Sequence, residues 1–516
     1  MPKPNKKHIV QWNEVDIAVA NLNTDTEHLI QVQREAIPLV FVPGIMGSRL
    51  RRTGTDGVGD GDDGLPNLRW DPGDARWMIK HFSGESPQHR KRMLIGSAFD
   101  PDFLEVDKST PIGNGFRGLM KDYHEKFLKV LLKEIDVKWR PLGKIFVFPV
   151  FGVGYNWTDS SDTSGKKLAA RIAEIIAEAK QITGRCEKVI VITHSMGGIV
   201  ARSASELHGA RSSILGVIHG VQPATGAAAA YWRMKAGFEG IGPTSRILGN
   251  SGPTVTAVLG NMPGGLELLP NKFYRSGHDE RGWLRITEKG GVVLDLPKVD
   301  PYDEIYRVPA DVQPRKGEKP SKNTYWGLVD PNLLDPGSAP AGEPSAPVDQ
   351  SDPNSLSRAI RPNSWTQYLD LLDIAESFHD RLGRRTHPKT FCFYGVGHDT
   401  ADTVELRIES SWVSMDPYPK RGFRGFFTNS EGKSMKAVLQ DPAGAGDGTV
   451  PISSATFACA AGLRQAIEVE HQPAFEEAQA QRYTSRAIIS LCKEYYAQHR
   501  SAPGDFPLSE SDSVPV

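Results

Sequence analysis

The chain has 516 residues, a net charge of −1 and 24% charged residues. This balance provides no electrostatic footprint for nucleic acid, so no nucleic-acid partner is expected. No run of about 18 apolar residues occurs, so no segment is expected to span a membrane. The basic N-terminus, residues 1–7, is not followed by an apolar signal-peptide core, which predicts synthesis in the cytoplasm without a signal peptide.

The four cysteines are far apart and lack the spacing of metal ligands. We predict that they are buried free thiols, with one disulfide pair as the alternative. They are Cys186, Cys392, Cys459 and Cys492.

Apolar runs and helical periodicity alternate along the chain. Strands are expected at residues 37–42, 145–150, 189–192, 214–218, 390–395 and near 467–470. Helices are expected near 23–34 and at 118–135, 164–182 (capped by Ser164), 365–382 and 484–499. Because strands alternate with helices, the fold class is α/β, with a mostly parallel central sheet flanked by helices.

Composition changes along the chain suggest large insertions into this core. Residues 52–115 are rich in Gly, Asp and Pro, and the Pro-rich residues 331–353 are expected to form a surface loop. The expected organisation is a lead-in with the first strand (1–50), an insertion (51–117), core (118–221), a cap or lid insertion (222–363), core (364–500) and a flexible tail (501–516).

A strand, a serine on a sharp turn and a helix follow one another at residues 189–202. This layout is typical of a nucleophile elbow, in which the turn lifts the serine hydroxyl above the sheet. Ser195 is therefore the predicted nucleophile, with Gly197 and Gly198 allowing close packing. Thr193 departs from the G-x-S-x-G pattern, because it adds a side chain where glycine is usual.

A serine hydroxyl needs a base, and the base needs an orienting acid, in the chain order Ser, Asp, His for this fold class. Asp447 lies in a Gly-Asp-Gly turn, and His471 follows an apolar alternation 24 residues later. We predict these two as acid and base. His398 is the rival base, and Asp399 and Asp402 are rival acids. His194 is expected to point away from the nucleophile.

The developing oxyanion needs two N–H donors. One is expected from the backbone of Met196, the residue after the serine. The other is expected from Ile45, in the loop after the first strand.

Four motifs, at residues 42–48, 193–198, 266–270 and 446–451, resemble the α/β-hydrolase lipases of the lecithin:cholesterol acyltransferase and GPI-inositol-deacylase type. The resemblance implies Ser195, Asp447 and His471 as the catalytic triad, Ile45 and Met196 as oxyanion donors, and a lipid acyl ester as substrate. Residues 222–239 are similar to bacterial type VI secretion phospholipase effectors. That similarity implies export to the periplasm of a target cell and a neutralising immunity protein as partner.

The insertions are suited to a lipase, since Tyr231, Trp232, Met234, Phe238 and residues 266–269 are expected to form an apolar cap. The Asp/Gly run at 56–64 does not have EF-hand spacing, so no metal and no cofactor is expected. The alternatives to a lipase or phospholipase are a soluble carboxylesterase for short acyl esters and a non-catalytic binding protein on a hydrolase scaffold.

Overall fold

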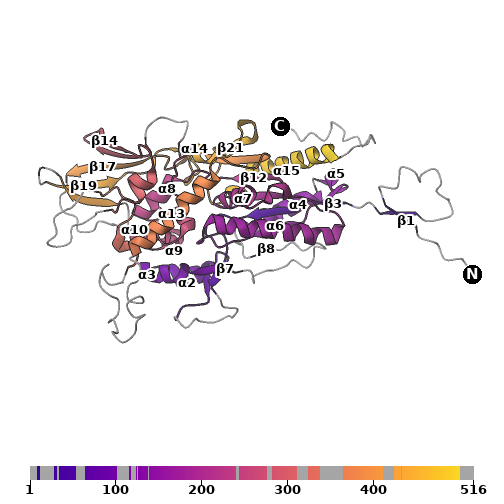
Figure 1. The fold of residues 1–516 in the computed structure, drawn as a ribbon, viewed down its shortest axis with the longest axis horizontal. Helices are drawn as coiled ribbons and strands as arrows, with labels where there is room; N and C mark the ends of the chain where they lie inside the picture. The colour runs from indigo at the N-terminus through magenta and orange to yellow at the C-terminus, as the bar shows by residue number, and fades with distance from the viewer. Residues whose placement is uncertain are drawn as a thin grey trace, which may run out of the picture.

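The computed structural model describes residues 8–11, 28–31, 34–53, 64–100, 116–117, 124, 126–137, 139–239, 243–275, 282–310, 324–336, 364–410, 423–429, 431 and 433–499. The molecule is elongated, with a parallel sheet in one half and a smaller mixed sheet with helices in the other (Figure 1). The expected tail at 501–516, most of the Asp/Gly run and most of the Pro-rich loop lie outside the described residues.

The central sheet has seven strands, and every neighbouring pair is parallel. The expected α/β class is therefore confirmed at the level of a parallel sheet flanked by helices. In spatial order the strands are β21 (Arg464–Glu468), β15 (Thr390–Val396), β12 (Ile214–Gly220), β11 (Val189–His194), β4 (Leu39–Val42), β10 (Val150–Val153) and β8 (Phe116–Arg117).

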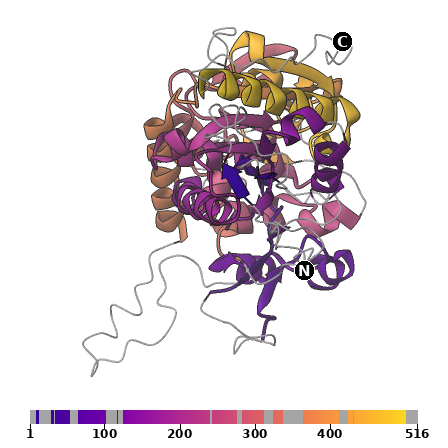
Figure 2. The ribbon, with the colours of Figure 1, turned by 90° about the vertical axis from the view of Figure 1, so that its right-hand side faces the viewer.

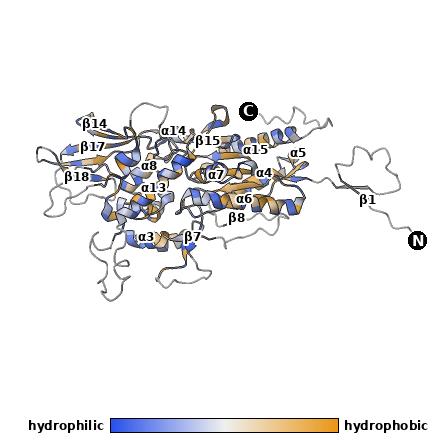
Figure 3. Ribbon diagram, viewed as in Figure 1, coloured by the Kyte–Doolittle hydropathy of each residue, from blue (hydrophilic) through white to orange (hydrophobic). Residues whose placement is uncertain are grey.

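Alternate residues of the inner strands pack on opposite faces of this sheet. Val191 belongs to the same buried apolar cluster as Leu168 and Val200, which come from α6 (Ser161–Thr183) and α7 (Gly197–Glu206). Ile190 belongs to a second cluster together with Phe127 and Leu491, which come from α4 (Lys126–Val137) and α15 (Ala478–His499). This two-residue period explains why residues 189–192 of β11 are all apolar, since helices cover both faces of the sheet (Figures 2 and 3).

Two boundaries differ from those expected. The run at 145–150 is divided into β9 (Phe146–Val147) and β10, with Pro149, which has no N–H to donate, between them. Helix α6 begins at Ser161, and its N-cap is Ser160, whose Oγ accepts from the N–H of Asp162 at 3.1 Å. Ser164 lies inside the helix, so its assignment as the cap was wrong.

The prediction of a short helix near 23–34 was also wrong. Residues 28–31 form strand β2 (His28–Gln31), which pairs in parallel with β1 (His8–Gln11). The pairing partner is 20 residues away in the sequence, so local periodicity does not reveal it.

The second sheet is built from two distant stretches of chain. Strands β14 (Gly291–Leu296) and β13 (Leu284–Glu288) pair with β17 (Val404–Ser410), followed by β19 (Ser434–Leu439) and β18 (Arg424–Thr428). The segment 364–500, expected to belong to the core, therefore contributes to both sheets. With its neighbouring helices this sheet makes up the cap, which consists of the second sheet, α8 (Ala228–Ala236), α9 (Pro243–Leu248), α10 (Gly252–Leu259), α11 (Pro263–Leu266), α2 (Ala75–Phe82) and α3 (Pro87–Leu94).

The remaining elements connect these parts. They are β3 (Glu35–Ala36), β5 (Leu50–Arg52), β6 (Leu68–Trp70), β7 (Ser97–Phe99), α5 (Arg140–Gly143), η4 (Ala210–Ser213), η5 (Tyr302–Tyr306), η6 (Pro331–Leu333), α13 (Ser364–Leu382), β16 (His398–Asp399), β20 (Ala445–Gly446), α14 (Ile452–Ala455), η7 (Ala461–Leu463) and η8 (Ala474–Glu476). Helix α13 confirms the expectation at 365–382. Among the described residues, no helix is both long and apolar enough to cross a bilayer.

The prediction that all four cysteines are free was wrong for one pair. Cys392 in β15 and Cys459 after α14 form a disulfide, with their Cα atoms 6.1 Å apart. They are 67 residues apart in the sequence, and only the fold brings them within bonding distance. Cys186 and Cys492 are buried free thiols, as predicted.

Candidate active site

Ser195 lies on a strained turn at the carboxyl end of β11. Its φ of 53° is in the left-handed region, which is uncommon for a residue with a side chain. The turn is held by two backbone bonds, from Ser195 N–H to the carbonyl of Gly220 and from Gly198 N–H to the carbonyl of Ser195, both 2.9 Å. The hydroxyl thus projects between the end of β11 and the start of α7.

The neighbours of the turn must be small. A Cβ on Gly197 would lie 2.4 Å from the carbonyl oxygen of Pro43 and 2.5 Å from that of Val42. A Cβ on Gly44 would lie 2.9 Å from the Cβ of Ser195. The loop after β4 therefore lies directly against the serine.

Thr193, the departure from the usual pattern, is fully buried. Its hydroxyl is 2.8 Å from Nδ1 of His219 on the adjacent strand β12. Burial is the main cause that lowers the pKa of His219, to about 3, so this imidazole is neutral near pH 7. The additional side chain is thus accommodated by a hydrogen bond between strands.

The structure brings together Ser195, His471 and Asp447. Oγ of Ser195 is 2.8 Å from Nε2 of His471, and Nδ1 of His471 is 2.7 Å from Oδ2 of Asp447. Since a carboxylate accepts hydrogen bonds, Nδ1 carries the proton and Nε2 is free to accept from the hydroxyl. The arrangement therefore has the geometry of a nucleophile, a base and an orienting acid.

Asp447 is fixed by the turn that follows it. Its Oδ1 accepts from the N–H groups of Thr449 at 2.9 Å and Val450 at 2.6 Å. Its backbone carbonyl accepts from the N–H of His471 at 2.9 Å. This bond connects the turn that carries the candidate acid to the loop that carries the candidate base. The carboxylate is buried, with its side chain 1% exposed.

The rival acid and base residues do not join the hydrogen-bond chain of Ser195, His471 and Asp447. Asp402 accepts from Arg275 at 2.6 Å and from Ser453 at 2.8 Å. His398 and Asp399 line the cavity described below, but no hydrogen bond joins them to His471 within the described residues.

The predicted oxyanion donors lie next to the nucleophile. Met196 is the N-cap of α7, and Ile45 lines the cavity in front of Ser195. The Ile45 loop is held by Trp70, whose indole N–H donates to the carbonyl of Met46 at 2.8 Å. Met46 itself has a left-handed φ of 64°.

A cavity of about 670 Å³ opens over Ser195 and His471. This volume is in the range of small-molecule sites. One wall is apolar and comes from the β6–α2 region and the cap helices; it includes Trp70, Met78, Ile247, Leu248, Leu259 and Leu268. Other lining residues are polar and are called here the polar wall; they are Arg233, His398, Asp399, Thr449, Glu470 and Gln472.

Of the residues expected to form an apolar cap, only some line the cavity. Phe238 and Leu268 do so, whereas Tyr231 and Met234 are buried inside the cap. Trp232 donates its indole N–H to the carbonyl of Gln440 at 3.2 Å. The sequence pattern identified apolar residues but not the direction in which each side chain points.

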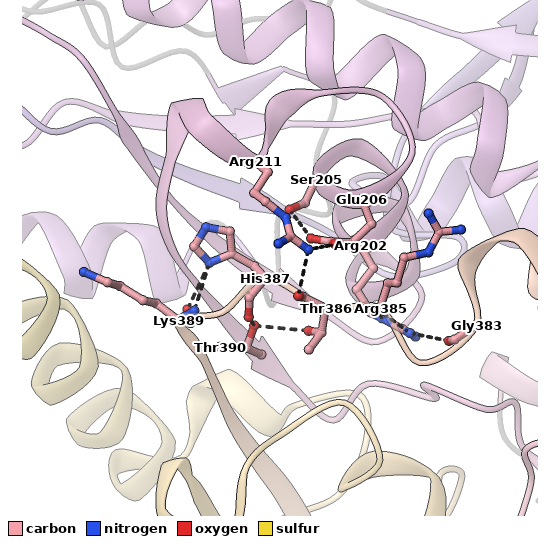
Figure 4. A network of polar contacts seen from close by, with 10 residues as sticks. All are labelled: Arg202, Ser205, Glu206, Arg211, Gly383, Arg385, Thr386, His387, Lys389 and Thr390. Atoms are coloured by element: carbon pink, nitrogen blue, oxygen red, sulfur yellow. Dashed lines mark hydrogen bonds and ion pairs between the residues drawn. The ribbon is translucent and has the colours of Figure 1, made fainter.

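Helix α7 is anchored behind the nucleophile by Arg202 (Figure 4). This buried guanidinium donates to the carbonyls of Gly383 at 3.0 Å, Arg385 at 2.9 Å and Ala224 at 3.2 Å. Burial lowers the pKa of Arg202 to about 10, so the side chain stays charged at neutral pH. Arg202 therefore ties the helix after the turn to the loop between α13 and β15.

The sequence did not reveal that His194 contacts the loop that carries His471. Its Nε2 is 2.9 Å from the backbone carbonyl of His471. The only sequence signal for a role of His194 was its position next to Ser195. The contact itself could not be predicted, because it joins residues 277 positions apart. Within the described residues, no cluster of His, Cys, Asp and Glu has the arrangement of a metal site.

No protein-family model and no curated protein sequence matches the chain. Among solved structures, the chain is similar to one in the crystal structure of the Tle4-Tli4 complex, with 22% identity, a TM-score of 0.68, and coverage of 89% of this chain and 99% of that one. Lipase BlEst2 of Bacillus licheniformis (19% identity, 38% and 44% covered) and phospholipase PlaB of Legionella pneumophila (11%, 78% and 81%) have TM-scores of 0.16 and 0.20.

The fold and the site together define a class: an α/β protein with a Ser-His-Asp hydrogen-bond chain at the carboxyl ends of parallel strands. Its fold is that of the Tle4 complex structure over most of both chains.

Proposed function

We propose that this protein is a serine hydrolase of the α/β-hydrolase type that cleaves acyl esters of lipids or phospholipids. The observation that carries the proposal is the chain from Ser195 through His471 to Asp447 beneath a cavity of about 670 Å³ with an apolar wall. A hydroxyl hydrogen-bonded to an oriented imidazole is the arrangement that acyl transfer requires.

In the proposed reaction, Oγ of Ser195 attacks the ester carbonyl while His471 takes its proton. Asp447 keeps the imidazole in the correct tautomer and stabilises the imidazolium. The N–H groups of Ile45 and Met196 stabilise the tetrahedral oxyanion. His471 then protonates the leaving alcohol, and water releases the acid from the acyl-enzyme in a second round of the same steps.

Product analysis on mixed phospholipid and acylglycerol vesicles tests this function. Ser195→Ala should lower the release of fatty acid by at least about 10⁴-fold, the size of effect seen when a serine nucleophile is removed. The matched control is Ser205→Ala, on the same helix, whose hydroxyl donates to Glu206. Equal release by the two variants would refute Ser195 as nucleophile, and release only from soluble short-chain esters would favour a carboxylesterase.

We further propose that the protein is a type VI secretion effector with a neutralising protein partner. The support is the resemblance of residues 222–239 and the fold shared with a protein that is found in a complex, Tle4 with Tli4. Directing the chain to the periplasm of a bacterial host should arrest growth, and Ser195→Ala should abolish the arrest. Growth that is unaffected by the active protein in the periplasm would contradict this proposal.

A further inference from the structure

Arg233 is the only Lys or Arg that lines the cavity in the described part of the chain. It comes from α8 in the cap, and its side chain is 16% exposed. A partly buried guanidinium needs hydrogen-bond acceptors for its N–H groups, so its contacts determine which of its donors remain for a ligand.

The guanidinium is held in one orientation by three contacts. Nε lies 3.0 and 3.3 Å from the carboxylate oxygens of Glu239, and Nη2 donates to Oγ1 of Thr449 at 3.0 Å. The ring of Phe238 lies beneath it, with its centroid 4.9 Å from Cζ. Of the five N–H donors, these bonds use one at Nε and one at Nη2, which leaves three for a ligand.

Glu239 does not neutralise Arg233 completely. Its side chain is 40% exposed, so water weakens the ion pair. Two further carboxylates, Asp399 and Glu470, line the same polar wall. An anion is therefore stable at this wall only in contact with the guanidinium.

Thr449 places Arg233 close to the reacting groups. Its hydroxyl accepts from Arg233, and its backbone N–H donates to the carboxylate of Asp447 at 2.9 Å. In the proposed binding mode, the ester carbonyl lies at Ser195, the acyl chain contacts the apolar residues of the cavity, and the alcohol part contacts the polar wall. In a glycerophospholipid, that alcohol part carries a phosphate a few bonds from the ester.

We propose that Arg233 binds the phosphate of the substrate by charge-assisted hydrogen bonds, and so makes phosphate-bearing acyl esters the preferred substrates over uncharged acylglycerols. Arg233 is thus a specificity-determining residue, and Glu239 with Thr449 orients it. The inference rests on the proposed function, because it assigns the chemistry of that enzyme's substrate.

The experiment compares dihexanoyl phosphatidylglycerol with dihexanoylglycerol, both as monomers in solution, so that binding to a lipid surface does not contribute. Arg233→Gln should lower kcat/KM for the phospholipid by roughly tenfold to a hundredfold, chiefly through KM, because charge-assisted hydrogen bonds are lost. For dihexanoylglycerol the change should be less than threefold. Arg233→Lys, which keeps the charge but not the planar donors, should fall between these values.

The matched control is Arg246→Gln, on α9 of the cap, where the side chain is exposed and does not line the cavity. It should behave as the wild type. Equal loss on both esters in Arg233→Gln would mean that the residue only ties α8 to Thr449, and no loss on either would mean that phosphate does not contact it; both results overturn the inference. A wild type that cleaves neither ester overturns the proposed function and the inference with it.

A second measurement uses only the wild type, and so stands even if Arg233→Gln does not fold. sn-Glycerol 3-phosphate should inhibit the hydrolysis of dihexanoylglycerol competitively, and the inhibition should weaken as salt rises. Glycerol at the same concentration should have no effect. Absence of inhibition by millimolar glycerol phosphate would refute a phosphate site at the polar wall.

Discussion

Nε2 of His194 donates a hydrogen bond to the backbone carbonyl of His471 at 2.9 Å. The direction follows from the chemistry, because a carbonyl only accepts. Burial, with a smaller contribution from the charge of His471, lowers the pKa of His194 to about 4, so the imidazole is neutral near pH 7. The residue before the proposed nucleophile therefore fixes the backbone of the proposed base.

Loss of this donor should slow the reaction without weakening substrate binding. His194→Phe keeps a ring of similar shape but removes the donor to the partly buried carbonyl of His471. We expect kcat to fall about tenfold with KM changed less than threefold. Steady-state kinetics measure this, with His208→Phe, a histidine paired with Asp162 away from the site, as control. Unchanged kcat in His194→Phe would show that the bond does not position His471.

The residues of the candidate site could be predicted from the sequence only in part. Ser195, Asp447 and His471 could be selected as candidates because strand ends, glycine turns and chain order are local patterns, and the structure brings these three side chains within hydrogen-bonding distance. The contact of His194 with His471 spans 277 residues, and the bond from Arg233 to Thr449 spans 216. Such contacts depend on packing between distant segments, which periodicity does not encode.

The fold, like the site, was predictable where the sequence signal is local and not where distant segments pair. The parallel sheet followed from alternating apolar runs and helices, each detectable within about 20 residues. The second sheet did not, because β13 pairs with β17 across more than 100 residues that include a segment of biased composition. The disulfide between Cys392 and Cys459 was missed for the same reason.

Glu267 joins the cap to the core through a buried carboxyl group. It accepts from Oγ of Ser160 at 2.6 Å and from the N–H of Ser161, the first residue of α6, at 2.7 Å. Burial raises the pKa of Glu267 to about 7, although these two hydrogen bonds oppose the shift. The folded protein therefore retains a proton here that the unfolded chain loses near pH 4.5.

This difference gives a pH dependence of known sign. Between about pH 4.5 and 7 the folded state binds more protons at Glu267 than the unfolded state, so the contribution of Glu267 to the free energy of unfolding falls as pH rises. In Glu267→Gln this contribution is absent. Denaturant unfolding at pH 5 and pH 7.5 should show wild type losing stability relative to Glu267→Gln as pH rises.

The control for this measurement is Glu431→Gln, a glutamate whose side chain is 66% exposed. Its difference from wild type should be nearly the same at both pH values. A difference between wild type and Glu267→Gln that stays constant, or changes in the opposite direction, would refute a raised pKa at Glu267.

The Cys392–Cys459 disulfide closes a loop that contains the Asp447 turn. Thiol titration of the unfolded, unreduced chain should find two free thiols, Cys186 and Cys492, and four after reduction. Cys459→Ser should lower the free energy of unfolding by about 2–5 kcal/mol, as for the removal of a native disulfide. Cys186→Ala controls for the loss of a buried thiol alone. Four free thiols before reduction would contradict the pairing.

The apolar wall should set the length of acyl chain that the enzyme accepts. Leu248 lines the cavity at the end of α9, and Leu248→Trp would fill part of the volume of about 670 Å³. We expect kcat/KM for esters of long acyl chains to fall at least about tenfold, with little change for acetyl or butyryl esters, since excluding several methylenes costs about 0.8 kcal/mol each. A uniform loss over all chain lengths would place the acyl chain elsewhere.

The central claim is that Ser195 is a nucleophile activated by His471. The most direct measurement is intact-mass spectrometry after treatment with a fluorophosphonate, which reacts with activated serine hydroxyls. The wild type should gain one adduct, mapped by peptide sequencing to Ser195, whereas Ser195→Ala should gain none and Ser205→Ala should gain one. No adduct on the folded wild type, or an adduct that persists in Ser195→Ala, would contradict the assignment.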